Sequence, residues 1–194
     1  MEFRLIYEGR LMSQSRSNSR VTEKHQIRKV FHKQLAALWE EHPTLLRTSK
    51  SHMLHAQLAQ EFSRNGFNFV PLINQKYGGA FAVLDILFLR RDHPGNFVSN
   101  TGDIDNRIKV LFDALRMPKG ASEIGENVTP DADEDPFYCL LEDDSLITEV
   151  NLKTDRLLTP FAGAHDHQLN DTMLVIHCKT GVFNNAAMYA EAFW

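Results

Sequence analysis

Cysteine is scarce in this sequence. Among its 194 residues only Cys139 and Cys178 occur, and their separation fits neither a redox motif of two nearby cysteines nor the ligand spacing of a zinc site. These features exclude a disulfide-rich scaffold and a zinc finger. We therefore expect both thiols to be reduced residues of the core, as in a cytoplasmic protein.

Long apolar runs are also missing. No run approaches the roughly 20 residues that a helix needs to cross a bilayer, and Met1–Leu5 lacks the basic-then-apolar layout of a secretory signal. We therefore expect no membrane partner and a cytoplasmic location. The hydrophobic fraction of 43% and charged fraction of 24% are typical of a globular protein. The length suits a single domain over residues 1–194.

The chain lacks the net positive charge that is usual in nucleic-acid-binding proteins, since its formal charge is −4. The charge is nevertheless uneven along the sequence. Between residues 10 and 33 only Glu23 is acidic, whereas the basic residues are Arg10, Arg16, Arg20, Lys24, Arg28, Lys29 and Lys33. Such a region can contact phosphates. It can equally be a solvated loop and helix face, and the residues alone leave both interpretations open.

Hydrophobic periodicity indicates a mixture of strands and helices. Alternating or β-rich apolar runs predict strands over 3–7, 67–73, 80–89, 146–152 and 172–178. The second and third of these runs, separated by Gly78-Gly79, predict a hairpin. Helical spacing predicts one helix capped by Thr22 and ended by Pro43, a second over 52–62 and a third over 184–194. The irregular order of the elements predicts an α+β fold.

The helix after Asp103 has the clearest pattern. Its apolar stripe, which we expect to face the core, consists of Ile108, Leu111, Phe112 and Leu115. The opposite face carries Asp105, Lys109 and Asp113 at intervals of four. We expect Asp103 in the entering loop and Asp105 at the helix cap, where free backbone N–H groups favour negative charge.

Two acidic clusters, Asp103 with Asp105 and Asp143 with Asp144, lie at the boundaries of apolar elements. Closely spaced carboxylates repel one another unless a proton, a cation or water intervenes. Mg²⁺ binds such carboxylates together with substrate phosphates, and Lys109 indicates an anionic substrate. The combination predicts a metal-dependent phosphodiester-cleaving enzyme. Taken singly, the first pair also suits helix capping and the second pair a turn.

Two further features have alternative interpretations. The segment 119–136 is rich in Gly, Pro, Asp and Glu, which predicts a flexible, solvated acidic loop. Phe112 completes the core stripe with Leu115 in one interpretation. In the other it projects toward DNA and wedges between bases.

The run Asp-x-Asp-Asn-x-x-Lys, leading into Phe-Asp-Ala-Leu and followed by an Asp-Asp pair that opens a strand, resembles the RusA family of Holliday junction resolvases. The matching residues are Asp103, Asp105, Asn106, Lys109, Phe112, Asp113, Ala114, Leu115, Asp143 and Asp144, with Lys153 as a further candidate. The resemblance covers roughly residues 80–156. It implies a small mixed β-sheet flanked by helices. The N-terminal helical region (about 20–66) and the acidic insertion (about 119–136) would be elaborations of it.

The resemblance also implies a function. It predicts a Mg²⁺- or Mn²⁺-dependent endodeoxyribonuclease that forms a homodimer and cuts four-way or other branched DNA. The metal ligands would be Asp103, Asp105 and Asp144, with Asp143 as a neighbouring partner or occasional ligand, and Lys109 would offset charge on the phosphate. From the basic region and the helix, the candidates for DNA contacts are Arg10, Arg16, Arg20, Lys24, Arg28 and Phe112.

Two alternatives belong to other classes. A non-catalytic nucleic-acid-binding module could keep the same fold. Its acidic residues would then cap helices and keep the loops solvated. A metal-dependent phosphoryl or nucleotidyl transferase would need a nucleotide-binding glycine loop, and Gly78-Gly79 is too short to form one. Loss of cleavage on replacing Asp105 with asparagine separates the nuclease from the binding module.

Overall fold

The computed structural model describes residues 1–15, 19–50, 52–76, 79–91, 98–99, 102–125, 128–159 and 171–183, and for 52–54, 98–99 and 102–103 it describes the backbone only. Arg16 and the expected helix over 184–194 lie outside these ranges. The strands are β1 (Glu2–Arg10), β2 (Ser63–Arg64), β3 (Phe67–Ile73), β4 (Ala80–Arg90), β5 (Val98–Ser99), β6 (Gly102–Asp103), β7 (Phe137–Leu141), β8 (Ile147–Arg156) and β9 (Asp171–Val182).

The helices are α1 (Val21–Glu41), α2 (Pro43–Lys50), α3 (His52–Glu61) and α4 (Ile104–Leu115), with 3₁₀ turns η1 (Ala121–Glu123) and η2 (Asp144–Leu146). This content confirms the predicted α+β class. Thr22 lies inside α1 instead of capping it, because α1 begins at Val21. Among the described helices, none is long and apolar enough to cross a membrane.

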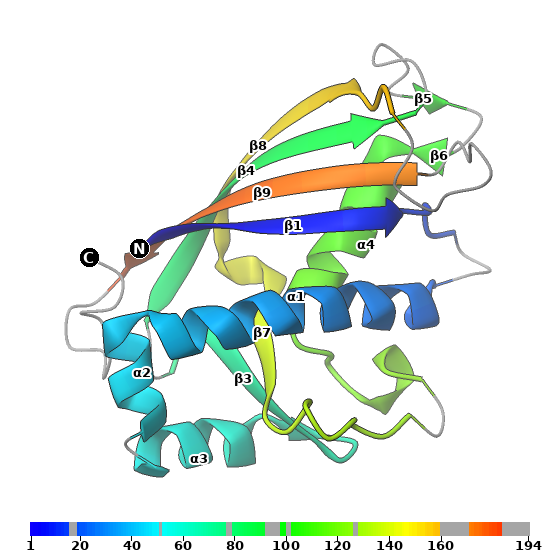
Figure 1. Cartoon of the computed structure of the whole chain (residues 1–194). Helices are drawn as coiled ribbons and strands as arrows, with labels where there is room; N and C mark the ends of the chain where they lie inside the picture. The colour runs from blue at the N-terminus through cyan, green and yellow to red at the C-terminus, as the bar shows by residue number, and fades with distance from the viewer. Residues whose placement is uncertain are drawn as a thin grey trace.

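The larger sheet has the strand order β1-β9-β4-β8. Strand β9 is antiparallel to both of its neighbours, and β8 is parallel to β4. Helices α1 and α4 lie on one face of this sheet (Figure 1). Along β4 buried and partly exposed residues alternate, as expected for a strand with one face against helices and the other toward solvent.

The smaller sheet has the order β2-β3-β7 and lies on the other side of α1 (Figure 1). The predicted hairpin of β3 and β4 is therefore wrong, because β3 pairs with β2 and β7 whereas β4 pairs with β8 and β9. From Phe69 to Ile73 every residue of β3 is buried. A continuous apolar run is typical of a strand covered on both faces, and β3 is indeed parallel to β7.

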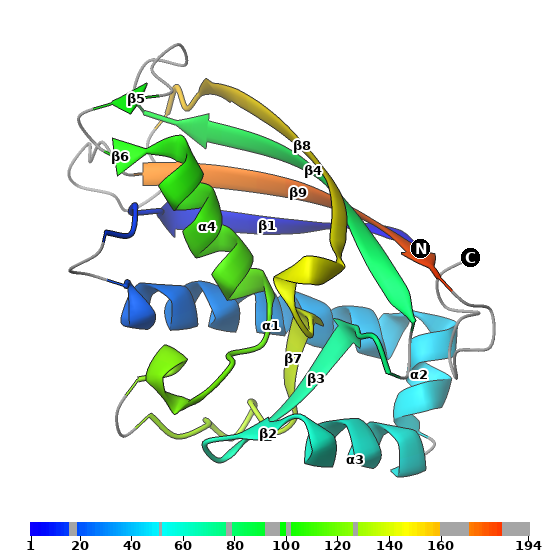
Figure 2. The same ribbon diagram turned by 180° about the vertical axis from the view of Figure 1, so that it is seen from behind.

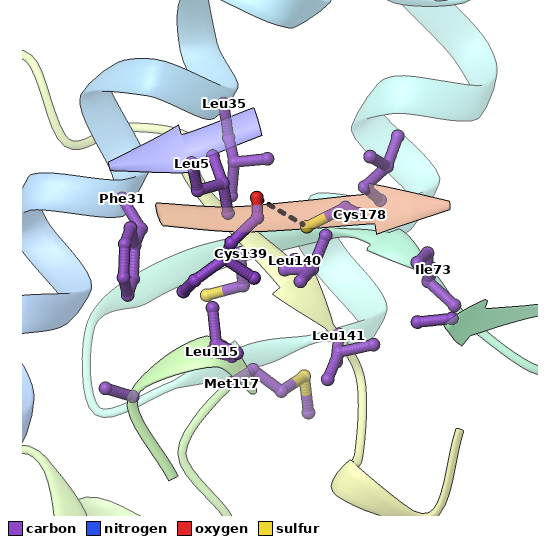
Figure 3. Packing of buried hydrophobic residues seen from close by; sticks show 14 of the residues in the cluster. Leu5, Phe31, Leu35, Ile73, Leu115, Met117, Cys139, Leu140, Leu141 and Cys178 are labelled. Atoms are coloured by element: carbon purple, nitrogen blue, oxygen red, sulfur yellow. Dashed lines mark hydrogen bonds between the residues drawn. The ribbon is translucent and has the colours of Figure 1, made fainter. Parts of the chain in front are cut away.

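The core lies where α1 meets the two sheets. Ile27, Phe31, Leu35 and Trp39 of α1 are at most 2% exposed. Figure 3 shows Phe31 and Leu35 beside Leu5 of β1 and Cys139 of β7. Both cysteines are buried and form no disulfide, as predicted. Burial raises the pKa of each thiol to about 12, so both stay protonated at neutral pH.

The acidic segment 119–136 is attached to α1 in its described part. Lys29 Nζ lies 2.8 Å from carboxylate oxygens of both Asp131 and Glu134, and the Glu134 residue is only 2% exposed. The backbone N–H of Tyr138 donates to Nδ1 of His32 (2.9 Å), which leaves Nε2–H to donate to the Asp133 carbonyl (2.9 Å). The expectation of a solvated loop therefore fails for Glu134.

Burial of His25 predicts acid sensitivity. The residue is 5% exposed, its ring lies 5.5 Å from that of Phe67 and 6.0 Å from that of Phe137, and neither ring nitrogen has a hydrogen-bond partner in the described part of the chain. Burial, with Arg28 and Lys29 nearby, lowers the pKa of His25 to about 4. Below pH 6.5 His25 binds a proton in the unfolded chain but not in the folded chain. The free energy of unfolding therefore falls as the pH drops toward 4.

We expect this loss to be roughly 1.4 kcal/mol per pH unit from His25 alone. Replacing His25 with phenylalanine should make the free energy of unfolding less dependent on pH between 6.5 and 4.5. Urea unfolding of both proteins at several pH values measures this. An unchanged slope in His25→Phe would show that His25 is not the group responsible.

Candidate functional site at the start of helix α4

The start of α4 is defined by the strand before it. Strand β6 pairs with β5, with Val98 opposite Asp103, and the helix begins at the next residue, Ile104. Asp103 therefore precedes the helix directly, and Asp105 lies inside its first turn. The expectation that Asp105 is the cap is wrong by two positions, because the backbone becomes helical earlier than the sequence indicated.

Asp105 and Lys109 form a solvent-facing pair on the first turns of α4. Their side chains are 59% and 58% exposed, and Lys109 Nζ lies 3.8 Å from Asp105 Oδ2. The backbone N–H of Asn106 donates to Asp105 Oδ1 (2.8 Å). Free N–H groups at a helix start favour negative charge. This end of α4 thus presents an anion and a cation that a large substrate can reach.

The buried face of α4 consists of Ile104, Arg107, Val110, Leu111, Ala114 and Leu115. Two residues of the predicted stripe, Leu111 and Leu115, belong to it. The other two, Ile108 and Phe112, are only partly buried and pack against the core from the side. For Phe112 this contact favours the packing interpretation over insertion between bases.

Asp143 and Asp144 lie at the opposite end of α4. Asp143 precedes η2, where its Oδ1 accepts from the Ser145 N–H (3.0 Å) and its Oδ2 lies 3.2 Å from Lys119 Nζ. Hydrogen bonds from Ser145 and then Lys119 lower the pKa of Asp143 to about 2. Asp144 Oδ2 lies 4.0 Å from Nε of Arg116, the residue that follows α4.

The two acidic clusters are therefore separated by the length of the helix. At about 1.5 Å per residue, Asp105 and Arg116 are roughly 16 Å apart along the helix axis. Figure 2 shows the start of α4 beside β6 and its end beside the short helix η2. The structure brings Asp105 and Lys109 together, and Asp144 near Arg116, but it does not bring Asp144 near Asp105.

The sequence predicts that Asp103 and Asp105 hold a metal at the start of α4. Among the residues that the structure describes, no group of three or more His, Cys, Asp or Glu could hold a metal ion, and the side chain of Asp103 is outside that description. Two neighbouring aspartates are hard oxygen donors, and Mg²⁺ often binds one or two carboxylates with phosphate oxygens and water completing its shell. Asp105 is the carboxylate at this end of α4 whose side chain the structure describes.

Two residues predicted to contact DNA are buried instead. Lys24 is 8% exposed and Arg28 is 1% exposed. Lys24 Nζ lies 2.6 Å from Asp113 Oδ2. The guanidinium of Arg28 donates to the carbonyls of Asp113 (2.7 Å), Arg116 (3.2 Å) and Glu123 (3.5 Å). The prediction that Lys24 and Arg28 bind phosphate is therefore not supported, because both side chains are buried and bind groups of the protein itself.

The remaining basic candidates differ in exposure. Arg10 at the end of β1 is exposed and lines a hollow of about 370 Å³ together with Tyr7, Met12, Glu23 and Gln26. Arg20 donates to Glu23 (3.1 Å) and to the Ser13 carbonyl (3.1 Å). Arg10 is thus the described member of the set that is best placed to contact a phosphate.

The sequence interpretation missed a polar network between α1, α4 and the segment after α4. Arg116 donates to Asp113 Oδ1 (2.8 Å) and to Glu123 (2.8 and 3.0 Å), and Lys24 pairs with the same Asp113. The sequence does contain a pattern that indicates the burial of Lys24 and Arg28. Lys24 and Arg28 occur at helical spacing with the apolar residues Ile27, Phe31 and Leu35, which places them on the buried face of α1.

A second hollow lies on the outer face of the larger sheet. It has a volume of about 470 Å³ and is lined by residues of all four strands, including Arg4, Asp85, Asn151 and His177. Asp85 Oδ2 lies 2.7 Å from Lys179 Nζ, and Asp85 Oδ1 accepts from Asn151 (2.9 Å). Hydrogen bonds from Lys179 and Asn151 lower the pKa of Asp85. Its carboxylate is thus already engaged by neighbours of the sheet.

In comparisons with known proteins, no family model, curated protein or solved structure matches this chain.

Proposed function

We propose that the chain is a divalent-metal-dependent endonuclease whose reaction takes place at the start of α4. The observation that carries this proposal is the exposed pair of Asp105 and Lys109, one helical turn apart, directly after Asp103. The same residues carry the resemblance to the RusA family. A buried or fully neutralised pair would support a structural role instead.

In this proposal Asp103 and Asp105 hold Mg²⁺ or Mn²⁺. There such an ion would supply Lewis-acid chemistry, which would polarise the phosphodiester and favour deprotonation of the attacking water. Lys109 lies close enough to Asp105 to face the same phosphate, where its charge offsets the negative charge that develops in the transition state. The free N–H groups of the first turn of α4 favour the same anion.

The substrate that we propose is DNA, in a four-way or other branched form, on the basis of the family resemblance. Incubation of labelled four-way junction, Y-fork, single-stranded and linear duplex DNA with the protein in Mg²⁺ tests this. Paired nicks in the junction that disappear with EDTA are the expected result. Binding without cutting in both Mg²⁺ and Mn²⁺ would favour the non-catalytic module.

The position of Asp144 yields a separate prediction. Because Asp144 lies beside Arg116, roughly a helix length from Asp105, we expect Asp144→Asn to lower the cleavage rate far less than Asp105→Asn does. Single-turnover cleavage of the same junction by both variants measures this difference. Equal losses, in proteins of equal stability, would mean that Asp144 acts at the metal site despite its position.

A further inference from the structure

Strand β8 is an edge strand of the larger sheet. It is parallel to β4 on one side, and in the described part of the chain no strand pairs with its other side. It has ten residues, and every residue from Thr148 to Lys153 is exposed. Figure 1 shows it as the outermost strand, beyond β4. Such an edge presents free N–H and C=O groups to any strand that can align with it.

Side chains on both faces of β8 are exposed in the described part of the chain. Val150 and Leu152 align with the buried residues Leu84 and Ile86 of β4, yet they are 39% and 36% exposed. On the other face Asn151 donates to Asp85 of β4 and to Glu149 of its own strand. Exposed apolar residues that continue the buried side of a sheet are a feature of strands that acquire a neighbour.

The sequence of β8 is complementary to itself when it is read in the opposite direction. We infer that β8 pairs antiparallel with β8 of a second copy of this chain, across a two-fold axis at Asn151. In this register the three pairs on either side of the axis are Thr148 with the partner's Thr154, Glu149 with the partner's Lys153, and Val150 with the partner's Leu152, and beyond them Ile147 opposes the partner's Asp155. Each pair occurs twice by symmetry, and pairs of opposite charge, apolar pairs and Thr–Thr pairs all stabilise antiparallel strands.

Neighbouring registers are less favourable. Moving the axis by one residue keeps every side chain on its own face of the sheet, so these registers compete directly. With the axis at Leu152, Glu149 would oppose the partner's Asp155, which places like charges together. With the axis at Val150, Glu149 would oppose the partner's Asn151 and Lys153 the partner's Ile147, so the opposite charges would not meet. Only the axis at Asn151 gives charge complementarity and apolar pairing at the same time.

The first test reverses one charge and then both. Lys153→Glu places the new glutamate opposite the partner's Glu149. We therefore expect the dissociation constant of the dimer to rise at least tenfold. The double variant Glu149→Lys with Lys153→Glu restores opposite charges and should return the dissociation constant to within about threefold of the original. Lys33→Glu, an exposed position on α1, is the matched control and should have no effect.

Sedimentation equilibrium over a range of protein concentrations measures this with the full chain of 22.2 kDa. An unmodified chain that stays monomeric up to millimolar concentration would overturn the inference. A double variant as dissociated as Lys153→Glu would also overturn it. Neither result depends on the proposed nuclease activity, because no paired residue lies on α4.

The second test places a cysteine on the axis. Directly opposed residues of antiparallel strands have Cα atoms about 4.5–5.5 Å apart, within the range of about 4.4–6.8 Å that a disulfide requires. Mild oxidation should therefore cross-link Asn151→Cys into a covalent dimer, since the native cysteines are buried. Leu158→Cys, 78% exposed but beyond the strand, should not form this covalent cross-link. Equal cross-linking of the two variants would contradict the pairing.

Discussion

Replacing Arg28 with methionine should lower the free energy of unfolding by about 4 kcal/mol. The guanidinium of Arg28 donates to three backbone carbonyls, those of Asp113, Arg116 and Glu123, and the residue is 1% exposed. Methionine keeps most of the volume but makes none of these bonds. The carbonyls would then be left without this donor in a site that is largely closed to water, which costs more than the bonds themselves contribute.

Replacing Arg28 should also affect the candidate site on α4. Arg28 joins α1 to the end of α4 and to the segment after it, so its loss should loosen the helix that carries Asp105 and Lys109. Urea unfolding of the two proteins measures the change in stability. Lys33→Met on the same helix is the matched control, because Lys33 is exposed, and should change stability by less than about 0.5 kcal/mol.

A lysine at position 28 distinguishes charge from geometry. Arg28→Lys keeps the positive charge but cannot reproduce the planar fork of donors, so we expect its stability to lie between those of the methionine variant and the original. If Arg28→Met were as stable as Lys33→Met, Arg28 would not fasten α1 to α4, and its burial would need another explanation.

Replacing Asp105 with asparagine should reduce cleavage of the DNA substrate by at least about a thousandfold. The carboxylate is one of the two donors that this chain supplies to the proposed metal site, and an amide is a much weaker ligand for Mg²⁺. Asparagine has nearly the same shape, and Asp105 is 59% exposed. The fold should therefore be unaffected, with a stability change within about 0.5 kcal/mol.

The same replacement of Asp105 should not weaken DNA binding. Removal of one negative charge that faces a phosphate should leave DNA affinity unchanged or increase it. Single-turnover cleavage and equilibrium binding, measured on the same junction, separate the two effects. Cleavage by Asp105→Asn at the original rate would remove Asp105 from the chemistry, and parallel loss of binding and cleavage would indicate a role in recognition alone.

Local sequence patterns predicted most of the individual elements. The apolar spacing of Ile27, Phe31 and Leu35 gave α1 its correct position, and the β-rich runs matched β3, β4 and β9. The missed helix α2 begins at Pro43. Pro43 does end the pattern of α1, but proline is also favoured in the first turn of a helix, and the sequence alone did not decide between the two roles.

Long-range pairing could not be predicted in the same way. The hairpin of β3 and β4 was inferred from adjacency and Gly78-Gly79, whereas the pairing depends on which apolar faces are covered by α1 and the second sheet. The distance between the two acidic clusters is another long-range property. Each cluster lies at the edge of an apolar element, as predicted, but the 12-residue length of α4 separates them.

Charged residues at apolar positions were the other source of error. Lys24 and Arg28 lie on the buried face of α1. A count of basic residues treats them as surface charges, although their helical spacing assigns them to the interior. Such residues are buried only with partners. Lys24 and Arg28 both contact Asp113, 85 or more positions further along the chain, and local spacing cannot identify so distant a partner.

Isothermal titration calorimetry with Mn²⁺ is the measurement that tests for a metal site at the start of α4, because it needs no knowledge of the DNA substrate. We expect the unmodified chain to bind Mn²⁺, Asp105→Asn to weaken this binding at least tenfold, and Asp144→Asn to leave the dissociation constant within about twofold of the original. Equal binding by the unmodified chain and Asp105→Asn, or a larger loss in Asp144→Asn, would contradict a metal site at the start of α4.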